Sequence, residues 1–170
     1  MRDPASFDAF YNSSVRKVTG QLHAMTGSRS DAEDCVQEAF ARAWQRWDTV
    51  STYGDPEAWV RTVAYRISIS AWRKATSMRT AYRKHGVPDD DTRGLSPDYV
   101  AIMSALRQVP TGQRQAIVLH HLVGLSVDEI AKEAGVASGT IKARLSRGRH
   151  ALAPLLDERT GPVRGLGSDA

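Results

Sequence analysis

Apolar residues recur every three to four positions along most of the chain, with polar and charged residues between them. That spacing matches the turn of an α-helix, about 3.6 residues, and predicts helices rather than strands. The clearest case is the segment 31–47, where Val36, Phe40, Ala43 and Trp47 fall on one face. A helix of this kind buries its apolar face against other helices and leaves the opposite face in water.

Capping sequences predict where the helices of the first half begin. Ser30 and Glu33 form an S-x-x-E capping box, in which each side chain satisfies a free backbone N–H of the other residue. Asp55, Pro56 and Glu57 have the order of a helix start, a capping residue followed by a proline and an acid. The expected segments are a helix over about 3–25, a loop over 48–55 and a helix from 57 to at least 74.

The second half of the chain predicts a helix-turn-helix. Ser126 and Glu129 form a second capping box, and Gly135 follows as a helix breaker. A short helix, a glycine turn and a longer basic helix are typical of this motif. The expected helices are about 99–109, 113–123, 126–134 and 138–156.

The distribution of charge suggests a domain organisation. The chain has 170 residues and a net charge of +4, which divides into +4 over 1–85, −3 over 86–98, +4 over 99–156 and −1 over 157–170. The acidic segment contains two prolines and two glycines and has no apolar periodicity, as expected of a linker. We therefore expect an all-α fold with two small helical domains joined by a short acidic linker, and a disordered tail from residue 157.

Several function classes find no support in the sequence. Cys35 is the single cysteine, which excludes a disulfide framework and a multi-cysteine zinc site, and we expect it to be a small buried hydrophobe. No apolar run reaches the roughly 18 residues that span a membrane, and the polar start does not resemble a signal peptide. His120 and His121 are adjacent and should point to different helix faces rather than share a metal. We expect no catalytic site, metal, cofactor or small-molecule substrate, and a cytoplasmic location.

The last predicted helix is strongly basic. No acid occurs between Ser138 and Ala153, and like charges on one helix repel each other unless an anion offsets them. The major groove of DNA admits a helix and lies between two rows of phosphates. The residues expected to reach base edges are Lys142, Ala143, Ser146 and Arg147, and those expected to bind phosphates are Ser138, Thr140, Arg144 and Arg149.

A second basic segment, 58–85, combines cations with aromatic residues. It contains seven Lys or Arg residues, four aromatic residues and no acid over 28 positions. Cations that follow a phosphate backbone beside aromatic rings that stack on bases are what a site for single-stranded nucleic acid requires. Taken one at a time, aromatic residues such as Trp59 and Trp72 are more often core residues, so the acid-free run is the stronger signal.

Three segments resemble the extracytoplasmic-function (ECF) group of bacterial RNA polymerase sigma factors. They are DAEDCVQEAFARAWQRW at 31–47, EAWVRTVAYRISISAWRK at 57–74, and LRQVPTGQRQAIVLHHLVGLSVDEIAKEAGVASGTIKARLSRGRHAL at 106–152. The resemblance covers about 1–85 and 98–156. Many regulators share a helix-turn-helix, so the specific part is the acidic-to-aromatic helix 31–47 joined to it by a short linker.

The resemblance implies a role for each segment. The outer face of 31–47 would bind the clamp helices of the largest polymerase subunits through Asp34, Gln37, Glu38, Ala41, Arg42 and Gln45. The loop 48–55 would capture a flipped base of the −10 promoter element, and the helix 57–74 would contact the melted strand. The residues on the −10 side would be Thr52, Tyr53, Trp59, Arg61, Tyr65, Arg66, Ile69, Trp72, Arg73 and Lys74. The last helix would read the −35 element.

The resemblance also implies the partners, which are core RNA polymerase and promoter DNA in duplex and single-stranded form. The linker 86–98 would thread toward the active-site and RNA-exit channels of the polymerase. Factors of this group are commonly sequestered by an anti-sigma protein, which makes such a protein a further candidate partner. Arg66 stands where relatives often have Asn, and we expect it to move that contact toward a phosphate or to change the −10 preference.

Two other interpretations stay open. A free-standing regulator that binds duplex DNA without polymerase would explain the second domain, but it leaves the 31–47 helix and the acid-free aromatic run without a purpose. An interaction module would use its first domain for a protein partner only. Substitution of Lys142, Arg144 and Arg147 together by Ala separates this module from the readers of DNA.

Overall fold

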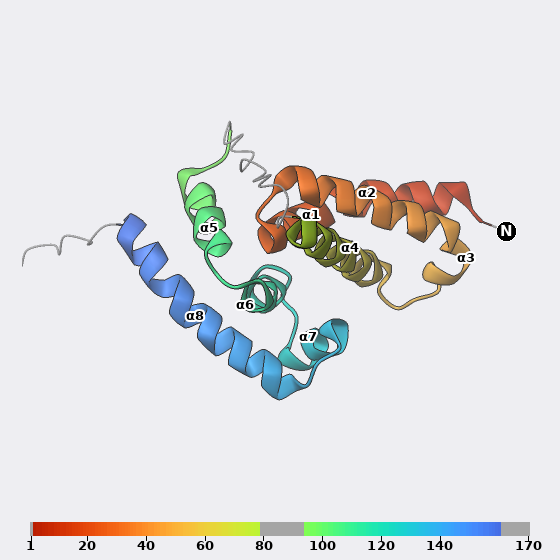
Figure 1. Ribbon diagram of the computed structural model, residues 1–170. Coiled ribbons are helices and arrows are strands. Elements are labelled where there is room, and N and C mark those ends of the chain that lie inside the picture. Colours follow the sequence, from red (N-terminus) through yellow and green to blue (C-terminus); the bar gives the residue numbers. More distant parts are fainter. Residues whose placement is uncertain (1, 79–93, 161–170) are drawn as a thin grey trace, which may run out of the picture.

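The computed structural model describes residues 2–78 and 94–160, and every regular element in these ranges is a helix (Figure 1). The first half contains α1 (Pro4–Thr26), α2 (Arg29–Gln45), α3 (Trp47–Val50) and α4 (Pro56–Met78). The second half contains α5 (Pro97–Arg107), α6 (Thr111–Ile117), a π-helical turn η1 (Val118–Leu122), α7 (Val127–Ala134) and α8 (Ser138–Thr160). The expected all-α fold is confirmed.

Helices α1, α2 and α4 pack around an apolar core. The predicted inner face of the segment 31–47 is buried throughout: Val36, Phe40 and Ala43 lie in α2, and Trp47 is the first residue of α3. Phe40 contacts aromatic rings of α1, and the closest of these, Tyr11, has its ring centroid 4.9 Å away. Complete burial of such a side chain contributes about 1.5–3 kcal/mol, so the apolar stripe of α2 holds this bundle together.

The start of α2 differs from the predicted capping box. Ser28, not Ser30, is the N-cap, and its hydroxyl accepts a hydrogen bond from a backbone N–H three residues later at 3.3 Å. Glu33 instead forms an ion pair with Arg29 at 3.0 Å, one helical turn before it. The prediction was wrong because Gly27, in the left-handed conformation with φ 78°, ends α1 and reverses the chain at once.

The segment expected as a loop over 48–55 is partly helical. Helix α3 takes up its first residues, and Trp47 and Val50 at the two ends of α3 are buried. Burial of these two apolar side chains stabilises a helical turn. The turn was not predicted because most residues of the segment are polar. Asp55 accepts a hydrogen bond from the Ala58 N–H at 2.9 Å, so the predicted start of α4 is confirmed.

The predicted helix-turn-helix is present in α7 and α8. The capping box is complete, with Ser126 accepting from the Glu129 N–H at 3.2 Å and Glu129 accepting from the Ser126 N–H at 2.7 Å. Gly135 is left-handed with φ 69° and ends α7. Ile141 and Leu145 of α8 are buried, as is Ile130 of α7. The second helix is therefore held at a defined angle to the first.

The segment expected as one helix over 113–123 is divided into α6 and η1. In η1 the Val123 N–H donates to the Val118 carbonyl, five residues earlier, at 3.1 Å. The rings of His120 and His121 have their centroids 4.8 Å apart, so these side chains are closer than expected for different faces. His120 Nδ1 is hydrogen-bonded to the Leu125 carbonyl at 2.8 Å.

Two predicted boundaries shift. Helix α5 begins at Pro97 with Ser96 as its N-cap, so the end of the expected linker is helical, and residues 86–93 lie outside the described residues. Helix α8 continues to Thr160, so 157–160 belong to it rather than to a disordered tail. The rest of the expected tail, 161–170, also lies outside the described residues.

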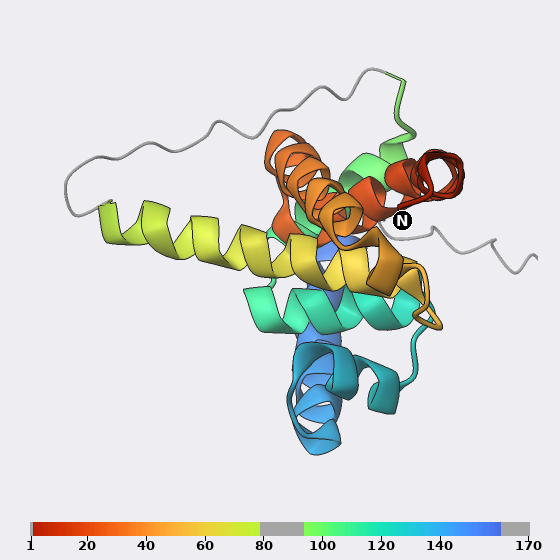
Figure 2. The ribbon, with the colours of Figure 1, turned by 90° about the vertical axis from the view of Figure 1, so that its right-hand side faces the viewer.

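The two halves of the chain pack against each other and share one buried core. Apolar residues of both halves, such as Met25 of α1 and Leu119 of η1, belong to a single cluster. Figures 1 and 2 show α4 lying alongside α6, with α8 below them. This arrangement covers one side of α4 with the second half of the chain.

Candidate polymerase and nucleic-acid interfaces

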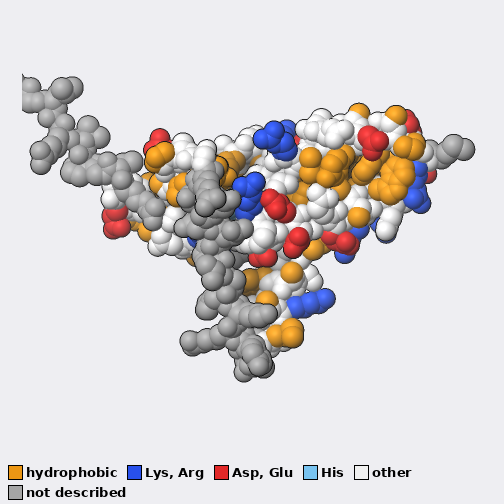
Figure 3. All heavy atoms as spheres, turned by 90° about the horizontal axis from the view of Figure 1, so that it is seen from above, with side chains coloured by type: hydrophobic (Ala, Val, Ile, Leu, Met, Phe, Trp, Pro, Cys, Tyr) orange, Lys and Arg blue, Asp and Glu red, His pale blue; other side chains and the backbone are white. Residues whose placement is uncertain are grey.

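The outer face of α2 presents the side chains expected to bind polymerase. All of them are exposed: Asp34, Gln37, Glu38, Ala41, Arg42 and Gln45. Arg42 Nε donates to Glu38 Oε1 at 2.8 Å along the helix surface. Figure 3 looks onto this side and shows charged groups of both signs, with apolar side chains gathered toward the end where α1 begins. Since the opposite face of α2 is in the core, this face is held in place and exposed to solvent.

The connection between α3 and α4 presents Thr52 and Tyr53. Both are exposed, and Tyr53 has 43% of its surface accessible. The Thr52 hydroxyl donates to the Thr49 carbonyl at 2.7 Å, which fixes the turn. Trp59, on the first turns of α4, is half-buried and packs against the core. Tyr53 is therefore the accessible ring of this connection, whereas Trp59 belongs to the edge of the core.

The C-terminal half of α4 extends beyond the other helices (Figure 2). Trp72 has 59% of its surface accessible, and Arg66, Arg73 and Lys74 are also exposed. An indole this exposed in water contributes nothing to a core. An aromatic ring flanked by guanidinium and ammonium groups suits a base and its phosphates.

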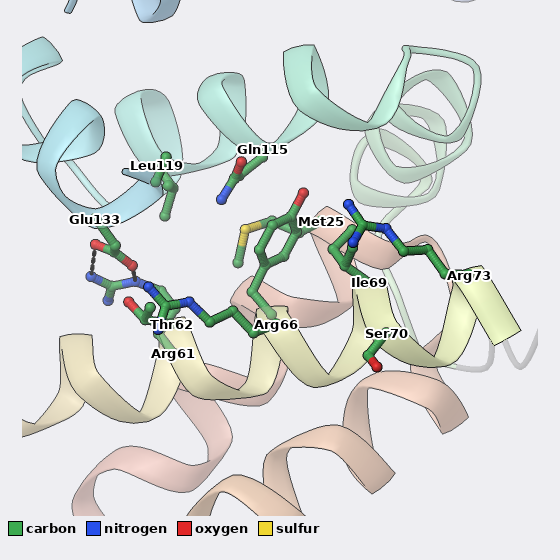
Figure 4. Close-up of a pocket in the computed structure, with 12 residues that line it drawn as sticks. Met25, Arg61, Thr62, Arg66, Ile69, Ser70, Arg73, Gln115, Leu119 and Glu133 are labelled. Atoms are coloured by element: carbon green, nitrogen blue, oxygen red, sulfur yellow. Dashed lines mark hydrogen bonds and ion pairs between the residues drawn. The ribbon is translucent and has the colours of Figure 1, made fainter. Parts of the chain in front are cut away.

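The inner side of α4 lines a cavity between the two halves of the chain (Figure 4). The cavity has a volume of about 340 Å³, and Tyr65, Ile69, Arg66 and Arg73 of α4 form one wall. Figure 4 shows the opposite wall, formed by residues of α6, η1 and α7. Burial raises the pKa of Tyr65, an effect that the nearby cations only partly oppose. Tyr65 and Ile69, expected on the nucleic-acid side, are thus half-buried here.

Arg61 is the predicted −10 residue that the structure places furthest from solvent. Its side chain is 3% exposed and forms a two-fold ion pair with Glu133 of α7, at 2.9 and 3.0 Å. Its third nitrogen donates to Gln21 Oε1 at 3.4 Å. Glu133 is not predictable from the sequence, because no local pattern connects residues 72 positions apart.

Basic groups also gather around the C-terminal end of α1. Arg107 Nε of α5 donates to the Gly27 carbonyl at 2.9 Å, and a Cβ at Gly27 would lie 3.2 Å from a terminal nitrogen of Arg114. The free carbonyls at a helix C-terminus attract cations. Burial, followed by Arg107 and Arg29, lowers the pKa of His23, against a smaller opposing effect of a nearby carboxylate.

Helix α8 presents most of its predicted DNA-binding residues to solvent. Exposed members of the set are Thr140, Lys142, Ser146, Arg147 and Arg149, and half-buried members are Ser138, Ala143 and Arg144. Arg144 lies over the start of α6, where a Cβ at Gly112 would be 3.4 Å from its guanidinium carbon. Arg144 therefore packs against α6, within the second half of the chain, and is not on the outer face of α8.

The described residues provide no metal site and no membrane-spanning helix, and they bury the cysteine. Those residues contain no group of three or more His, Cys, Asp or Glu side chains that could hold a metal ion. No helix within the described ranges is long and apolar enough to cross a bilayer. Cys35 is 6% exposed, and burial, together with Asp31 and Asp34, raises the pKa of its thiol. The thiol is therefore a buried apolar group, as expected.

Comparison with known proteins identifies two regions of one family in this chain. Residues 10–78 match the family Sigma-70 region 2, and residues 99–152 match Sigma-70, region 4. The ECF RNA polymerase sigma factor SigL of Mycobacterium tuberculosis is 32% identical over 164 residues, which cover 92% of this chain and 92% of SigL. SigJ of the same organism is 32% identical over 143 residues, which cover 76% of this chain and 45% of SigJ, so the chain spans about half the length of that relative.

A solved structure is similar along both halves of the chain. It is the sigma factor RpoE of Bartonella quintana, in complex with the anti-sigma factor NepR, with 27% sequence identity and a TM-score of 0.76. The similarity covers 89% of this chain and 96% of RpoE. The chain therefore belongs to the ECF RNA polymerase sigma factors of the sigma-70 family, non-enzymatic initiation factors that direct RNA polymerase to promoters.

Proposed function

We propose that this sigma factor uses three separate surfaces for three tasks. The outer face of α2 binds core RNA polymerase, the exposed part of α4 with the turn before it binds the −10 element, and the outer face of α8 reads the −35 element. The observation that carries this proposal is the exposure of the α2 face, where all the expected contact residues, from Asp34 to Gln45, project into solvent.

On the −10 side, Tyr53 and Trp72 are the rings we assign to stacking on unpaired bases. Stacking of one base on an aromatic side chain is worth about 1–3 kcal/mol. Bases are available for stacking only after the duplex opens, so binding them shifts the DNA toward the melted state. Arg66, Arg73 and Lys74 neutralise phosphates along the same strand.

On the −35 side, Lys142 and Arg147 are the residues we assign to base edges. Both have donors that suit the O6 and N7 acceptors of guanine in the major groove. Ala143 and Ser146 lie between them along the helix, and Thr140 and Arg149 bind flanking phosphates. A duplex reader in one half raises the effective concentration of the single-strand site in the other half.

We further propose an anti-sigma protein as a partner and the cytoplasm as the location. The sigma factor RpoE of Bartonella quintana was solved with its anti-sigma factor NepR, and its similarity to this chain extends over both halves. Core polymerase and the chromosome, which this factor must reach, are cytoplasmic in bacteria. The cavity between α4 and the second half of the chain is one surface open to such a partner.

Transcription by purified core RNA polymerase on a fragment library from the source genome tests the proposal. We expect start sites that appear only with this chain and share two upstream elements. Ala41→Arg places a bulky cation in the middle of the α2 face, and we expect it to abolish association with core. Asn12→Arg, at an exposed position of α1, adds the same group elsewhere and should leave association intact.

Two other outcomes would contradict the proposal. Duplex binding without association with core polymerase would identify a free-standing regulator. Association with core that is equally strong for Ala41→Arg and the unchanged chain would move the polymerase-binding surface away from α2.

A further inference from the structure

The pair between Arg61 of α4 and Glu133 of α7 joins the two halves of the chain. Two guanidinium nitrogens meet two carboxylate oxygens at 2.9 and 3.0 Å, and the side chains are 3% and 12% exposed. Figure 4 shows the pair at one end of the cavity. A two-fold contact of this kind is the strongest geometry that an arginine and a carboxylate can adopt.

This pair lies on the side of α4 that carries other groups assigned to nucleic acid. Tyr65 and Ile69 follow Arg61 along that side, and both face the cavity rather than open solvent. The second half of the chain therefore covers the inner part of the α4 surface. A phosphate cannot reach the Arg61 guanidinium while Glu133 occupies its two donors.

A second contact between the halves supports the same arrangement. Arg107 of α5 donates to the Gly27 carbonyl at the end of α1, at 2.9 Å. Arg107 is the last residue of α5. Its contact is with the end of α1, whereas Glu133 contacts α4. The Arg61–Glu133 and Arg107–Gly27 contacts involve different helices. Because polar contacts depend on direction and apolar packing does not, the two together fix one relative position of the halves.

Other groups oppose this arrangement. Arg114 Nε and His23 Nε2 are buried without a hydrogen-bond partner in the structure. Each lies beside residues of the other half, and each would be hydrated if the halves separated. Buried polar atoms without partners destabilise the state that buries them. The closed arrangement is therefore a balance between these unpaired groups on one side and the shared apolar core with the Arg61–Glu133 pair on the other.

We propose that the Arg61–Glu133 pair is an autoinhibitory latch, in which Glu133 takes the place of a DNA phosphate and holds the second half over the inner face of α4. The consequence for DNA rests on the proposed function, whereas the latch itself concerns only the two halves. Opening releases Arg61, Tyr65 and Ile69 together and frees α7 and α8 to move to a separate promoter element.

The physical chemistry of a buried pair explains why one substitution should open the latch. Removal of one partner leaves the other charge desolvated, which is strongly unfavourable. In a core that penalty unfolds the protein, but Arg61 lies at an interface, so separation of the halves restores its hydration. We therefore expect Glu133→Gln to favour the open state by about tenfold or more, with the helices intact.

Small-angle X-ray scattering of the full chain, together with binding of a labelled random-sequence single-stranded DNA, tests the proposal. We expect Glu133→Gln to increase the radius of gyration and to tighten DNA binding, with unchanged helical circular dichroism. The matched control is Glu33→Gln, which removes the same charge from an exposed pair within the first half. The control should match the unchanged chain in both measurements.

If Glu133→Gln has only a small effect, reversal of the charges in the pair provides a stronger test. Glu133→Arg places two guanidinium groups together and should open the chain fully, and the double variant Arg61→Glu with Glu133→Arg should close it again. An unchanged radius of gyration for Glu133→Arg would overturn the latch. An open Glu133→Gln chain with unaltered DNA binding would overturn its autoinhibitory role. Association with core polymerase, measured on the same variants, reports separately on the proposed function.

Discussion

Gly148 of α8 lies directly against Ile117 of α6. A Cβ at Gly148 would be 2.9 Å from the Ile117 Cγ1 atom, closer than two carbon atoms can approach without displacement. Gly139, on the same helix, has open space where its Cβ would be. The contact at Gly148 therefore sets how closely α8 approaches the helix behind it, and with it the position of the outer face of α8.

These two glycines should respond in opposite ways to the same substitution. We expect Gly148→Ala to lower the free energy of unfolding by about 1–3 kcal/mol, because the added methyl group overpacks the interface with α6. Gly139→Ala should leave stability unchanged or raise it by up to about 1 kcal/mol, since alanine favours the helix. Urea unfolding of both variants measures this. Equal effects at the two positions would contradict the close packing.

Base reading and phosphate binding by α8 should be separable. We expect Arg147→Ala to cost about 1–3 kcal/mol on the preferred duplex and to reduce discrimination at one base pair. Arg149→Ala should weaken binding to all sequences alike and reduce the slope of affinity against salt by about 1. Fluorescence anisotropy at several salt concentrations distinguishes the two. If Arg147→Ala also weakened binding to all sequences alike, α8 would contact only the phosphate backbone of DNA.

Trp72 should matter for DNA but not for folding. Because its side chain is 59% exposed, we expect Trp72→Ala to leave the melting temperature nearly unchanged. Loss of a stacking platform should weaken binding of single-stranded DNA by about 1–3 kcal/mol. Trp59→Ala provides the contrast, since this half-buried ring packs on the core and its loss should lower the melting temperature. A large loss of stability in Trp72→Ala would contradict the exposed position.

Stability should fall in mild acid because of His23. Burial and the cations Arg107 and Arg29 hold its pKa below the ordinary value of an imidazole. The His23 imidazole therefore binds a proton more tightly in the unfolded chain than in the folded chain. The free energy of unfolding is at its full value above about pH 6.5 and decreases as the pH falls toward the lower pKa of the folded state. Melting temperatures at about pH 7.5 and about pH 5.5, on either side of that value, measure the loss, which should be smaller in His23→Gln. Equal losses in both chains would rule out this role for His23.

The thiol of Cys35 should be unreactive in the folded chain. It is buried, and burial, followed by Asp31 and Asp34, raises its pKa, so little thiolate is present at neutral pH. We expect alkylation by iodoacetamide to be at least about tenfold slower than that of a free cysteine. Unfolding in urea should remove the difference. Rapid labelling of the native chain would indicate an open state of the first half.

Much of the helical framework followed from local patterns. The apolar stripe of α2 and the capping box of Ser126 and Glu129 were predicted and are present, because each depends on residues within a few positions of one another. The errors at Ser28 and at α3 have a common cause. Several residues could have capped or continued a helix there, and the choice among them depended on what the neighbouring helices bury.

The role of the second half as a cover for α4 could not be predicted in this way. Periodicity placed Arg61, Tyr65 and Arg66 on one basic and aromatic helix. The resemblance to sigma factors added −10 promoter DNA as the expected partner of this helix. Which of them meets solvent depends on the packing of α4 against α6 and α7. The pairing of Arg61 with Glu133 arises only when the two halves come together, since a contact across 72 positions leaves no trace in the spacing of nearby residues.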